Sequence, residues 1–342
     1  NKNLKNLKMR ILITGGAGYV GSLLTHNLLN KGYDVRVLDK LIFTDNSLKD
    51  IKDKIEIVKG DTRIIGPEIM DNIDAVIHLA GFSTEPTSQY SPRYTDLVNH
   101  LATERIAKMA KEKGVKRFIF ASSCSVYFSY DTLFIPDYYK ETDTVNPISA
   151  YSLSKRAAEE ALLELTDEHF QPIIFRKGTI YGFSPRMRYD LVLNSFTKDA
   201  FSLQKLTVNC NGEVWRPLAD IQDVVWAYTK ALEVPLEKAG GKIFNICSEN
   251  WNILDLAKKV QKVVKEKKNI DVKIEIQQKG IVRNYKADNS LLKQVFDFTP
   301  LRNLEDAIFE LWDWIEKHPD DILNPLYYND KLEIKLLETG QL

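Results

Sequence analysis

The sequence predicts an α/β fold, with a Rossmann-like, doubly wound parallel sheet and a smaller C-terminal α/β lobe. Two observations predict it. Short apolar runs alternate with longer segments of helical periodicity through the first half of the 342 residues. A glycine-rich turn also joins the first apolar run to the first helical segment, and this is the arrangement that opens a βαβ unit.

The elements of the first half follow one another in a regular order. We expect strands at residues 10–14, 34–39, 55–59, 75–79, 117–122 and 173–176. The helices between them include two long ones, at residues 95–113 and 150–168. Because parallel strands are joined by helices that cover the sheet, we expect helices on both faces of a single parallel sheet.

The last third of the chain has a mixed pattern. We expect a helix at residues 254–267, a short strand at 272–276 and a final helix at 304–316. These elements predict a smaller lobe over the carboxyl edge of the sheet, where open α/β sheets bind ligands. The predicted domains are a nucleotide-binding domain (residues 9–178, with 219–248 returning to it) and a substrate-binding lobe (residues 179–218 and 249–330).

The bulk composition excludes several classes of partner. Lys+Arg and Asp+Glu number 47 each, so no overall field attracts a nucleic acid or an anionic membrane. No apolar stretch is long enough to span a bilayer or to form the core of a signal peptide, and we expect a cytoplasmic protein. The three cysteines are widely spaced and no histidine pair has metal-ligand spacing, so we expect reduced thiols and no metal site.

The glycine-rich turn predicts a dinucleotide site. Its sequence TGGAGYVG (residues 14–21) would let backbone N–H groups approach a pyrophosphate at the start of a helix. Asp39 lies 18 residues beyond Gly21, at the end of the second strand, where a carboxylate binds both ribose hydroxyls of NAD. A 2′-phosphate would meet this negative charge, which favours NAD over NADP; the neighbouring Lys40, also an expected cofactor contact, leaves NADP open. The expected contacts of the turn are Gly15, Gly18, Tyr19, Val20 and Gly21.

A tyrosine, a lysine and a serine form the second motif. Tyr151 and Lys155 lie one helical turn apart, and the run SSCSVY (residues 122–127) leaves the preceding strand at its carboxyl end. A base that removes a hydroxyl proton near neutrality needs the tyrosine pKa, ordinarily about 10, lowered by roughly 3. Lys155 and an oxidised nicotinamide would both favour the phenolate, and Ser123 would hydrogen-bond the reacting oxygen.

With these motifs in this order, the chain resembles the extended short-chain dehydrogenase/reductases and, more narrowly, the NAD-dependent sugar-nucleotide epimerase/dehydratase family. The resemblance runs from about Arg10 to His318. It implies that Ser123, Tyr151 and Lys155 are catalytic, with Tyr151 and Lys155 also contacting NAD. The other NAD contacts that the resemblance implies are Asp61, Thr62, Leu79, Ala80, Gly81, Asn99 and Ser122.

The same resemblance, together with the chemistry of arginine, predicts where a nucleotide-diphosphate sugar binds. Arginine suits bidentate contacts to phosphate, and Arg216 falls in a segment similar to the family's diphosphate-binding motif. Thr179 stands where many members have an asparagine near the substrate phosphates. The expected substrate contacts are Ser123, Thr179, Arg186, Arg188, Asn194, Arg216 and Arg283.

One departure from the family pattern bears on the reaction. The family's dehydratases carry Asp-Glu after the catalytic hydroxyl, and here Cys124 and Ser125 stand at those positions. We therefore expect an epimerase that passes through a transient keto sugar, with a dehydratase or a 4-ketoreductase as the alternative. A non-catalytic NAD-binding regulator is a further alternative, although such proteins usually lose the tyrosine or the lysine. The resemblance also implies a homodimer, in which the two long helices pair across a two-fold axis as a four-helix bundle, as in relatives.

Overall fold

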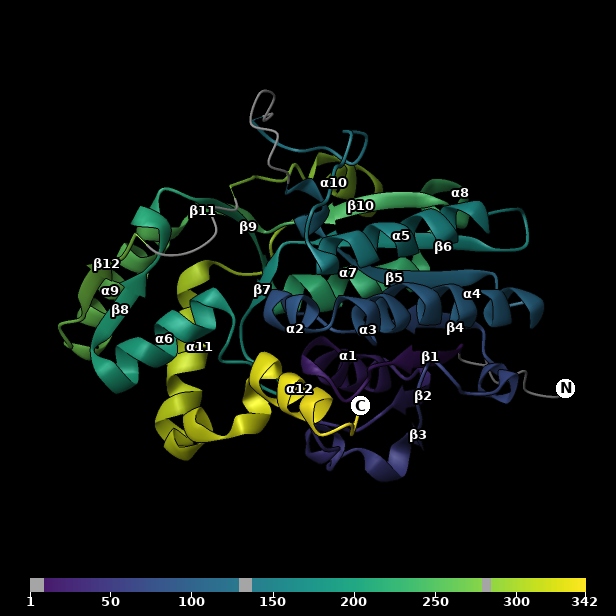
Figure 1. Cartoon of the computed structure of the whole chain (residues 1–342), viewed down its shortest axis with the longest axis horizontal. Coiled ribbons are helices and arrows are strands. Elements are labelled where there is room, and N and C mark those ends of the chain that lie inside the picture. Colours follow the sequence, from purple (N-terminus) through teal and green to yellow (C-terminus); the bar gives the residue numbers. More distant parts are fainter. Residues whose placement is uncertain (1–8, 129–136, 279–283) are drawn as a thin grey trace, which may run out of the picture.

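A central parallel sheet forms the body of the protein, whose computed structural model describes residues 9–128, 137–278 and 284–342. The strand order is β3-β2-β1-β4-β5-β6-β10, and every neighbouring pair is parallel (Figure 1). The strands are β1 (Arg10–Thr14), β2 (Asp34–Asp39), β3 (Glu56–Lys59), β4 (Ala75–His78), β5 (Arg117–Ser123), β6 (Gln171–Lys177) and β10 (Lys242–Ile246). The order reverses direction between β1 and β4, so a crevice opens there at the carboxyl ends of the strands.

Helices cover both faces of this sheet, which confirms the predicted doubly wound architecture. On one face α1 (Tyr19–Asn30) and α7 (Ile221–Glu233) bury Leu24, Leu28 and Val224 against the strands. On the other face α4 (Ala102–Glu112) and α5 (Ala150–Glu164) bury Ile106 and Leu162. In Figure 1 the sheet lies between these two helix layers.

The two long helices depart from their predicted bounds. The first is a helical path of α3 (Pro92–Asp96), a π-helical turn (Leu97–Leu101) and α4. The second, α5, ends at Glu164 and not at residue 168. It ends there because the Asp167 carboxylate accepts hydrogen bonds from the backbone N–H groups of His169 and Phe170, which forms a turn into β6.

A second lobe lies beyond the carboxyl ends of the strands (Figure 1). It has its own core around Leu193, Leu256, Val260 and Trp312. Two small sheets belong to it: β11 (Glu249–Asn252), β9 (Trp215–Asp220) and β7 (Thr179–Tyr181) in one, and β12 (Lys273–Ile276) with β8 (Lys205–Val208) in the other. Apart from α12, which is described below, the other α-helices of the whole protein are α2 (Glu85–Tyr90), α6 (Val192–Leu203), α8 (Leu236–Ala239), α9 (Ile253–Lys268), α10 (Ser290–Phe296) and α11 (Leu304–Lys317). Among the described residues, no helix is both long and apolar enough to cross a membrane.

The helix expected to be the last one, at residues 304–316, is followed by another. Two short 3-10 turns (Pro319–Leu323 and Pro325–Tyr327) lead from α11 to α12 (Asn329–Glu338). This helix returns to the central domain and packs against α2. Its sequence is largely polar and no side chain caps its start, so it carried no clear amphipathic signal. Contacts with the rest of the protein therefore stabilise it.

Candidate active site

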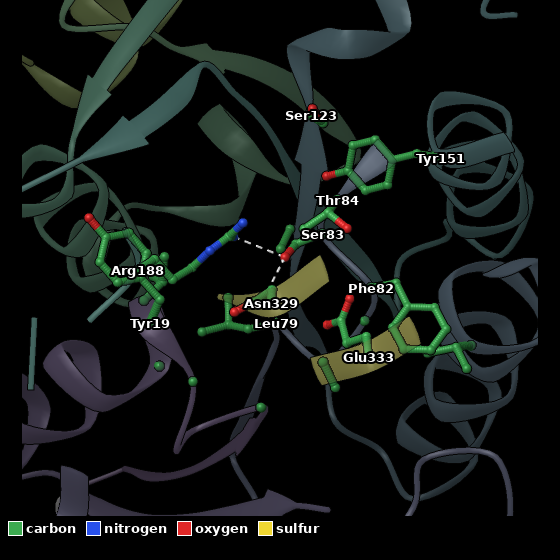
Figure 2. Close-up of a pocket in the computed structure, with 18 of the residues that line it drawn as sticks. Tyr19, Leu79, Phe82, Ser83, Thr84, Ser123, Tyr151, Arg188, Asn329 and Glu333 are labelled. Atoms are coloured by element: carbon green, nitrogen blue, oxygen red, sulfur yellow. Dashed lines mark hydrogen bonds between the residues drawn. The ribbon is translucent and has the colours of Figure 1, made fainter. Parts of the chain in front are cut away.

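A cavity of about 550 Å³ lies at the carboxyl edge of the central sheet, in the size range of small-molecule sites. Its walls come from the glycine-rich turn, the ends of β2, β4, β5 and β6, the segment that follows β7, and α12. Figure 2 shows Tyr151 and Ser123 at one end of this cavity and Arg188 and Tyr19 along another wall.

The glycine-rich turn is shaped so that only glycine fits at two of its positions. Gly15 has a φ of +74°, and a Cβ there would lie 2.8 Å from the backbone nitrogen of Ala80. A Cβ on Gly21 would lie 2.0 Å from the carbonyl oxygen of Gly15. The turn thus brings the start of α1 against the sheet edge, with its first N–H groups available to an anion. All five expected contacts of the turn line the cavity.

Asp39 is held at the end of β2 by its own chain. Its carboxylate accepts hydrogen bonds from the backbone N–H groups of Ala17 (3.0 Å) and Leu41 (2.8 Å). Burial nevertheless raises its pKa above the usual value. The ammonium of Lys40 lies 3.2 Å from Asp61, a carboxylate that also pairs with Arg63 at 2.6 Å. The residues present therefore fit a dinucleotide with an unmodified ribose.

The serine and the tyrosine of the second motif meet inside the cavity. Tyr151 and Ser123 both line the cavity, and Ser123 Oγ accepts a hydrogen bond from the N–H of Ser125 at 3.1 Å. The hydroxyl of Ser122 donates to Glu159 Oε1 at 2.5 Å. Because Ser122 is committed elsewhere, the geometry favours Ser123 as the hydroxyl that faces a substrate.

The pKa of Tyr151 differs from the expectation of a lowered value. Burial raises it to about 12, although the Ser123 side chain acts in the opposite direction. The ammonium of Lys155 donates to the carbonyl oxygen of Ala121 at 2.9 Å, and burial lowers the Lys155 pKa to about 8. The protein alone therefore keeps Tyr151 protonated, and the positive ring of oxidised NAD is the charge that remains to favour the phenolate.

A buried ion pair lies beneath these residues. Arg176 Nε and Nη2 donate to the two oxygens of Glu159 at 2.9 and 2.7 Å. The two side chains are 1% and 0% exposed. Glu159 lies one helical turn after Lys155 on α5, and Arg176 lies on β6. The pair joins helix to strand below the site and so holds Tyr151 and Lys155 at the end of β5.

Four of the seven expected substrate residues line the cavity from β7, β9 and the segment that follows β7: Thr179, Arg186, Arg188 and Arg216. Arg188 is held by the Asp190 carboxylate at 2.9 and 2.7 Å, and it donates to Ser83 Oγ at 3.0 Å. Arg216 lies over the ring of Tyr285, 5.5 Å from its centre. Arg186 lies over Phe43, 3.8 Å from the ring centre, on the same side of the cavity as Asp39. Ser123, the fifth, is at the sheet edge.

Two expected contacts, Asn99 and Asn194, do not line the cavity. Asn99 Oδ1 accepts from the N–H of Phe82 at 2.8 Å, and its amide donates to the carbonyl of Phe82 at 3.1 Å. Asn194 donates to the Tyr19 hydroxyl at 3.0 Å and accepts from the N–H of Gly182 at 3.0 Å. Each side-chain amide is hydrogen-bonded to residues behind the cavity, so Asn99 and Asn194 position their neighbours. Arg283 lies outside the described residues.

The cavity also contains residues that the sequence motifs did not single out. Glu85 lines it at the start of α2, and its charge raises the pKa of Tyr151. Thr84-Glu85-Pro86 has the composition of a helix start, and this signal could have located α2. Lys177, at the end of β6, donates to the Tyr228 hydroxyl at 3.3 Å, and burial lowers its pKa well below the usual value. Asn329, Asp330 and Glu333 of α12 complete the lining.

The fold and the site together define a dinucleotide-dependent enzyme of the extended short-chain dehydrogenase/reductase type. Residues 11–247 match the model of the NAD dependent epimerase/dehydratase family. This match covers more than half of the chain, and the chain belongs to that family; NAD is its cofactor.

Known proteins of this family resemble the chain over most of its length. UDP-glucose 4-epimerase of Pasteurella multocida (strain Pm70) is 27% identical over 340 residues, which cover 91% of this chain and 98% of that protein. dTDP-D-glucose 4,6-dehydratase of Dictyostelium discoideum is 30% identical over 276 residues, 73% of this chain and 61% of that protein. The crystal structure of UDP-glucuronic acid 4-epimerase from Bacillus cereus, in complex with UDP-glucuronic acid and NAD, has a TM-score of 0.79 at 23% identity and covers 91% of this chain and 100% of its own. This last likeness shows the shared fold.

Proposed function

We propose that the chain is an NAD-dependent epimerase of a nucleotide-linked sugar. The observation that carries the proposal is that Ser123 and Tyr151 line the same cavity as the glycine-rich turn and Asp39. The site can thus hold a hydroxyl-bearing carbon next to a dinucleotide and remove the hydroxyl proton. The proposed NAD contacts are the residues of the turn, Asp39, and those at the strand ends that line the cavity.

The proposed mechanism divides the work among three side chains. Tyr151 removes the proton from a sugar hydroxyl, while Ser123 donates a hydrogen bond that keeps the reacting oxygen in line. Bound NAD supplies the acceptor for the hydride that leaves the same carbon, and later returns it. Lys155 places a positive charge near the base and holds the end of β5 through the Ala121 carbonyl. The same Tyr151 returns the proton after the sugar has turned over, so the protein is regenerated unchanged.

A UDP-linked hexose is the proposed substrate class. Three of the most similar relatives, from Pasteurella multocida, Haemophilus influenzae and Bacillus subtilis, are named UDP-glucose 4-epimerases and are 26–27% identical over at least 90% of this chain. Arg216 and Tyr285 both line the cavity, and Arg216 is the proposed contact for the diphosphate. We propose that residues 9–178 and 219–248 form the nucleotide-binding domain and that residues 179–218 and 249–330 form the substrate-binding lobe.

The residues after Ser123 favour epimerisation over dehydration. Elimination of water needs an acid and a base beside the keto sugar, and the family's dehydratases carry carboxylates there. Cys124 is 1% exposed and its thiol donates to the carbonyl of Arg176, so it does not reach the cavity. One observation supports dehydration as the second candidate, because Glu85 brings a carboxylate into the cavity near Tyr151.

A panel of UDP- and dTDP-sugars, with product analysis by chromatography, NMR and mass spectrometry, tests the proposal. We expect an epimer of unchanged mass and no net change in NADH absorbance. Tyr151→Phe should lower turnover by about 10²–10⁴-fold or more and leave bound NAD in place. A product lighter by one water would instead identify a dehydratase, and stoichiometric consumption of added NADH a 4-ketoreductase. An active Tyr151→Phe variant would overturn the mechanism.

We further propose that the protein is a cytoplasmic homodimer. The helical path from α3 to α4 exposes Leu97 (37%) and Leu101 (43%), and α5 exposes Leu153 (50%). These apolar side chains lie on the helices that the dimer would pair, and their burial by a second copy would favour association.

A further inference from the structure

The segment after α11, residues 319–342, forms part of the cavity wall. Asn329, Asp330, Glu333 and Leu342 line it, opposite the glycine-rich turn and the end of β4. Figure 2 shows Asn329 and Glu333 on α12 facing the same space as Leu79, Phe82 and Arg188. None of these four residues belongs to the stretch 11–247 that matches the family model. We call residues 319–342 the α12 segment.

The α12 segment is tied to the nucleotide-binding side of the cavity by buried polar contacts. Glu333 is 2% exposed, and its Oε2 accepts a hydrogen bond from Thr87 Oγ1 of α2 at 2.7 Å. Asn329, 7% exposed, donates to Ser83 Oγ at 3.2 Å, and Ser83 also accepts from Arg188. Buried hydrogen bonds of this kind are costly to break because each leaves an unsatisfied polar group. The contacts hold α12 in one position over the loop between β4 and α2.

The segment is tied to the second lobe as well. The N–H of Tyr189 donates to the carbonyl of Tyr327 at 2.9 Å, and Arg186 Nη2 donates to the carbonyl of Leu326 at 2.9 Å. The Tyr189 ring contacts the rings of Tyr327 and Tyr328. The segment therefore bridges the two walls of the cavity, from Ser83 and Thr87 on one side to Arg186 and Tyr189 on the other.

Arg186 indicates which kind of ligand group this wall of the cavity would contact. It is 3% exposed, it lines the cavity, and within the described residues its Nε has no hydrogen-bond partner. Burial and, to a lesser extent, Arg188 lower the pKa of Arg186 to about 9, whereas Asp190, Glu333 and Asp39 act to raise it. A buried guanidinium with a spare donor is a site for an anion, and the phosphates of a dinucleotide bound at the α1 N-terminus and Asp39 would lie within this space.

We propose that the α12 segment is part of the dinucleotide site: it encloses the bound cofactor, with Arg186 as a donor to its phosphates, and so keeps NAD on the protein through many turnovers. The inference rests on the proposed function, in which NAD is reduced and reoxidised without leaving. A resident cofactor suits such a cycle, and exchange of NAD requires the α12 contacts to break.

The dissociation rate of isotope-labelled NAD tests this proposal directly. Labelled NAD is loaded onto the purified protein and its loss is followed after addition of excess unlabelled NAD. A protein that stops after His318 and the variant Glu333→Lys, which sets a cation against Arg186 and Arg188, should both release NAD at least about tenfold faster, the effect of one lost charged hydrogen bond. The matched control is Glu338→Lys, at an exposed position of the same helix, which should release NAD at the wild-type rate.

Circular dichroism and thermal melting establish that each variant is folded. If the shortened protein does not fold, Glu333→Lys and the double variant Thr87→Val/Asn329→Ala decide the question. Unchanged NAD release by folded variants would overturn the inference. Fast release from the variants combined with no epimerase activity in the wild type would leave the α12 site standing and remove the proposed reaction. Epimerase activity in the wild type, with unchanged NAD release from the variants, would support the proposed reaction and overturn the α12 inference.

Discussion

At the scale of single residues, burial and charge set the pKa of the proposed catalytic base, Tyr151. Burial disfavours the charged form of both key groups, and it raises the pKa of Tyr151 to about 12 while it lowers that of Lys155 to about 8. At neutral pH the protein alone therefore pairs a neutral phenol with an ammonium. A further positive charge next to the phenol is needed to make it a base, and the oxidised cofactor carries that charge.

The need for a positive charge beside the phenol predicts that NAD binding lowers the pKa of Tyr151. The phenolate is stabilised by a nearby cation, so its ultraviolet absorbance should appear at lower pH when NAD is bound than when it is absent. Lys155→Met should move the transition back towards higher pH. The control is Tyr151→Phe, in which this transition should be missing. An identical titration with and without NAD would contradict the coupling.

At the scale of elements, the site depends on how α5 is fastened to the sheet. The Glu159–Arg176 pair is fully enclosed, and removal of one partner leaves the other charge without compensation. Nearby on α5, Arg156 and Glu160 form a pair at 2.9 Å whose side chains are 30% and 54% exposed. Exposed pairs contribute little to stability, since water screens them.

We predict that Glu159→Ala lowers the free energy of unfolding by about 3–5 kcal/mol, whereas Glu160→Ala changes it by less than about 1 kcal/mol. Denaturant unfolding of both variants beside the wild type measures the difference. Equal effects of the two substitutions would show that the buried pair does not hold α5 in place.

The elements also show how far the sequence could be interpreted. Six strands of the parallel sheet were predictable because each is a short apolar run before a glycine or polar residue, as at β1 and β4, whereas β10 was not predicted as a strand. The small strands β7, β8, β9 and β11 were not, since runs of three to six residues in a mixed lobe carry no periodicity of their own. The helix α12 escaped for a different reason: its buried residues, Asn329 and Glu333, are polar and look like surface positions.

The sequence predicted the candidate site well where a motif constrains the backbone conformation. It predicted less well which side chains face the cavity. Gly15 and Gly21 stand at positions with no room for a Cβ, so a sequence pattern is enough to place them. Asn99 has no such constraint, and the structure turns it away from the cavity onto the backbone of Phe82. Glu85 and Lys177 enter the cavity through the long-range arrangement of α2 and β6, which no local pattern reveals.

At the scale of the whole molecule, the proposed dimer makes a further prediction. The exposed leucines of the π-helical turn and of α5 would be buried between two copies. Leu101→Glu combined with Leu153→Glu should therefore give the mass of a monomer by light scattering. Leu203→Glu, at a 62% exposed leucine of α6, is the matched control and should leave the dimer intact. A wild-type monomer at micromolar concentration would refute the dimer.

The central claim is that a hydride leaves a sugar carbon and returns to that same carbon within one enclosed site. The most direct measurement follows a nucleotide sugar, identified as a substrate by the panel and deuterated at the carbon that inverts, through one complete conversion. We predict an epimer that keeps the deuterium at that carbon, with no net NADH formed. Hydrogen from solvent at that carbon, or a panel that yields no epimer, would contradict it.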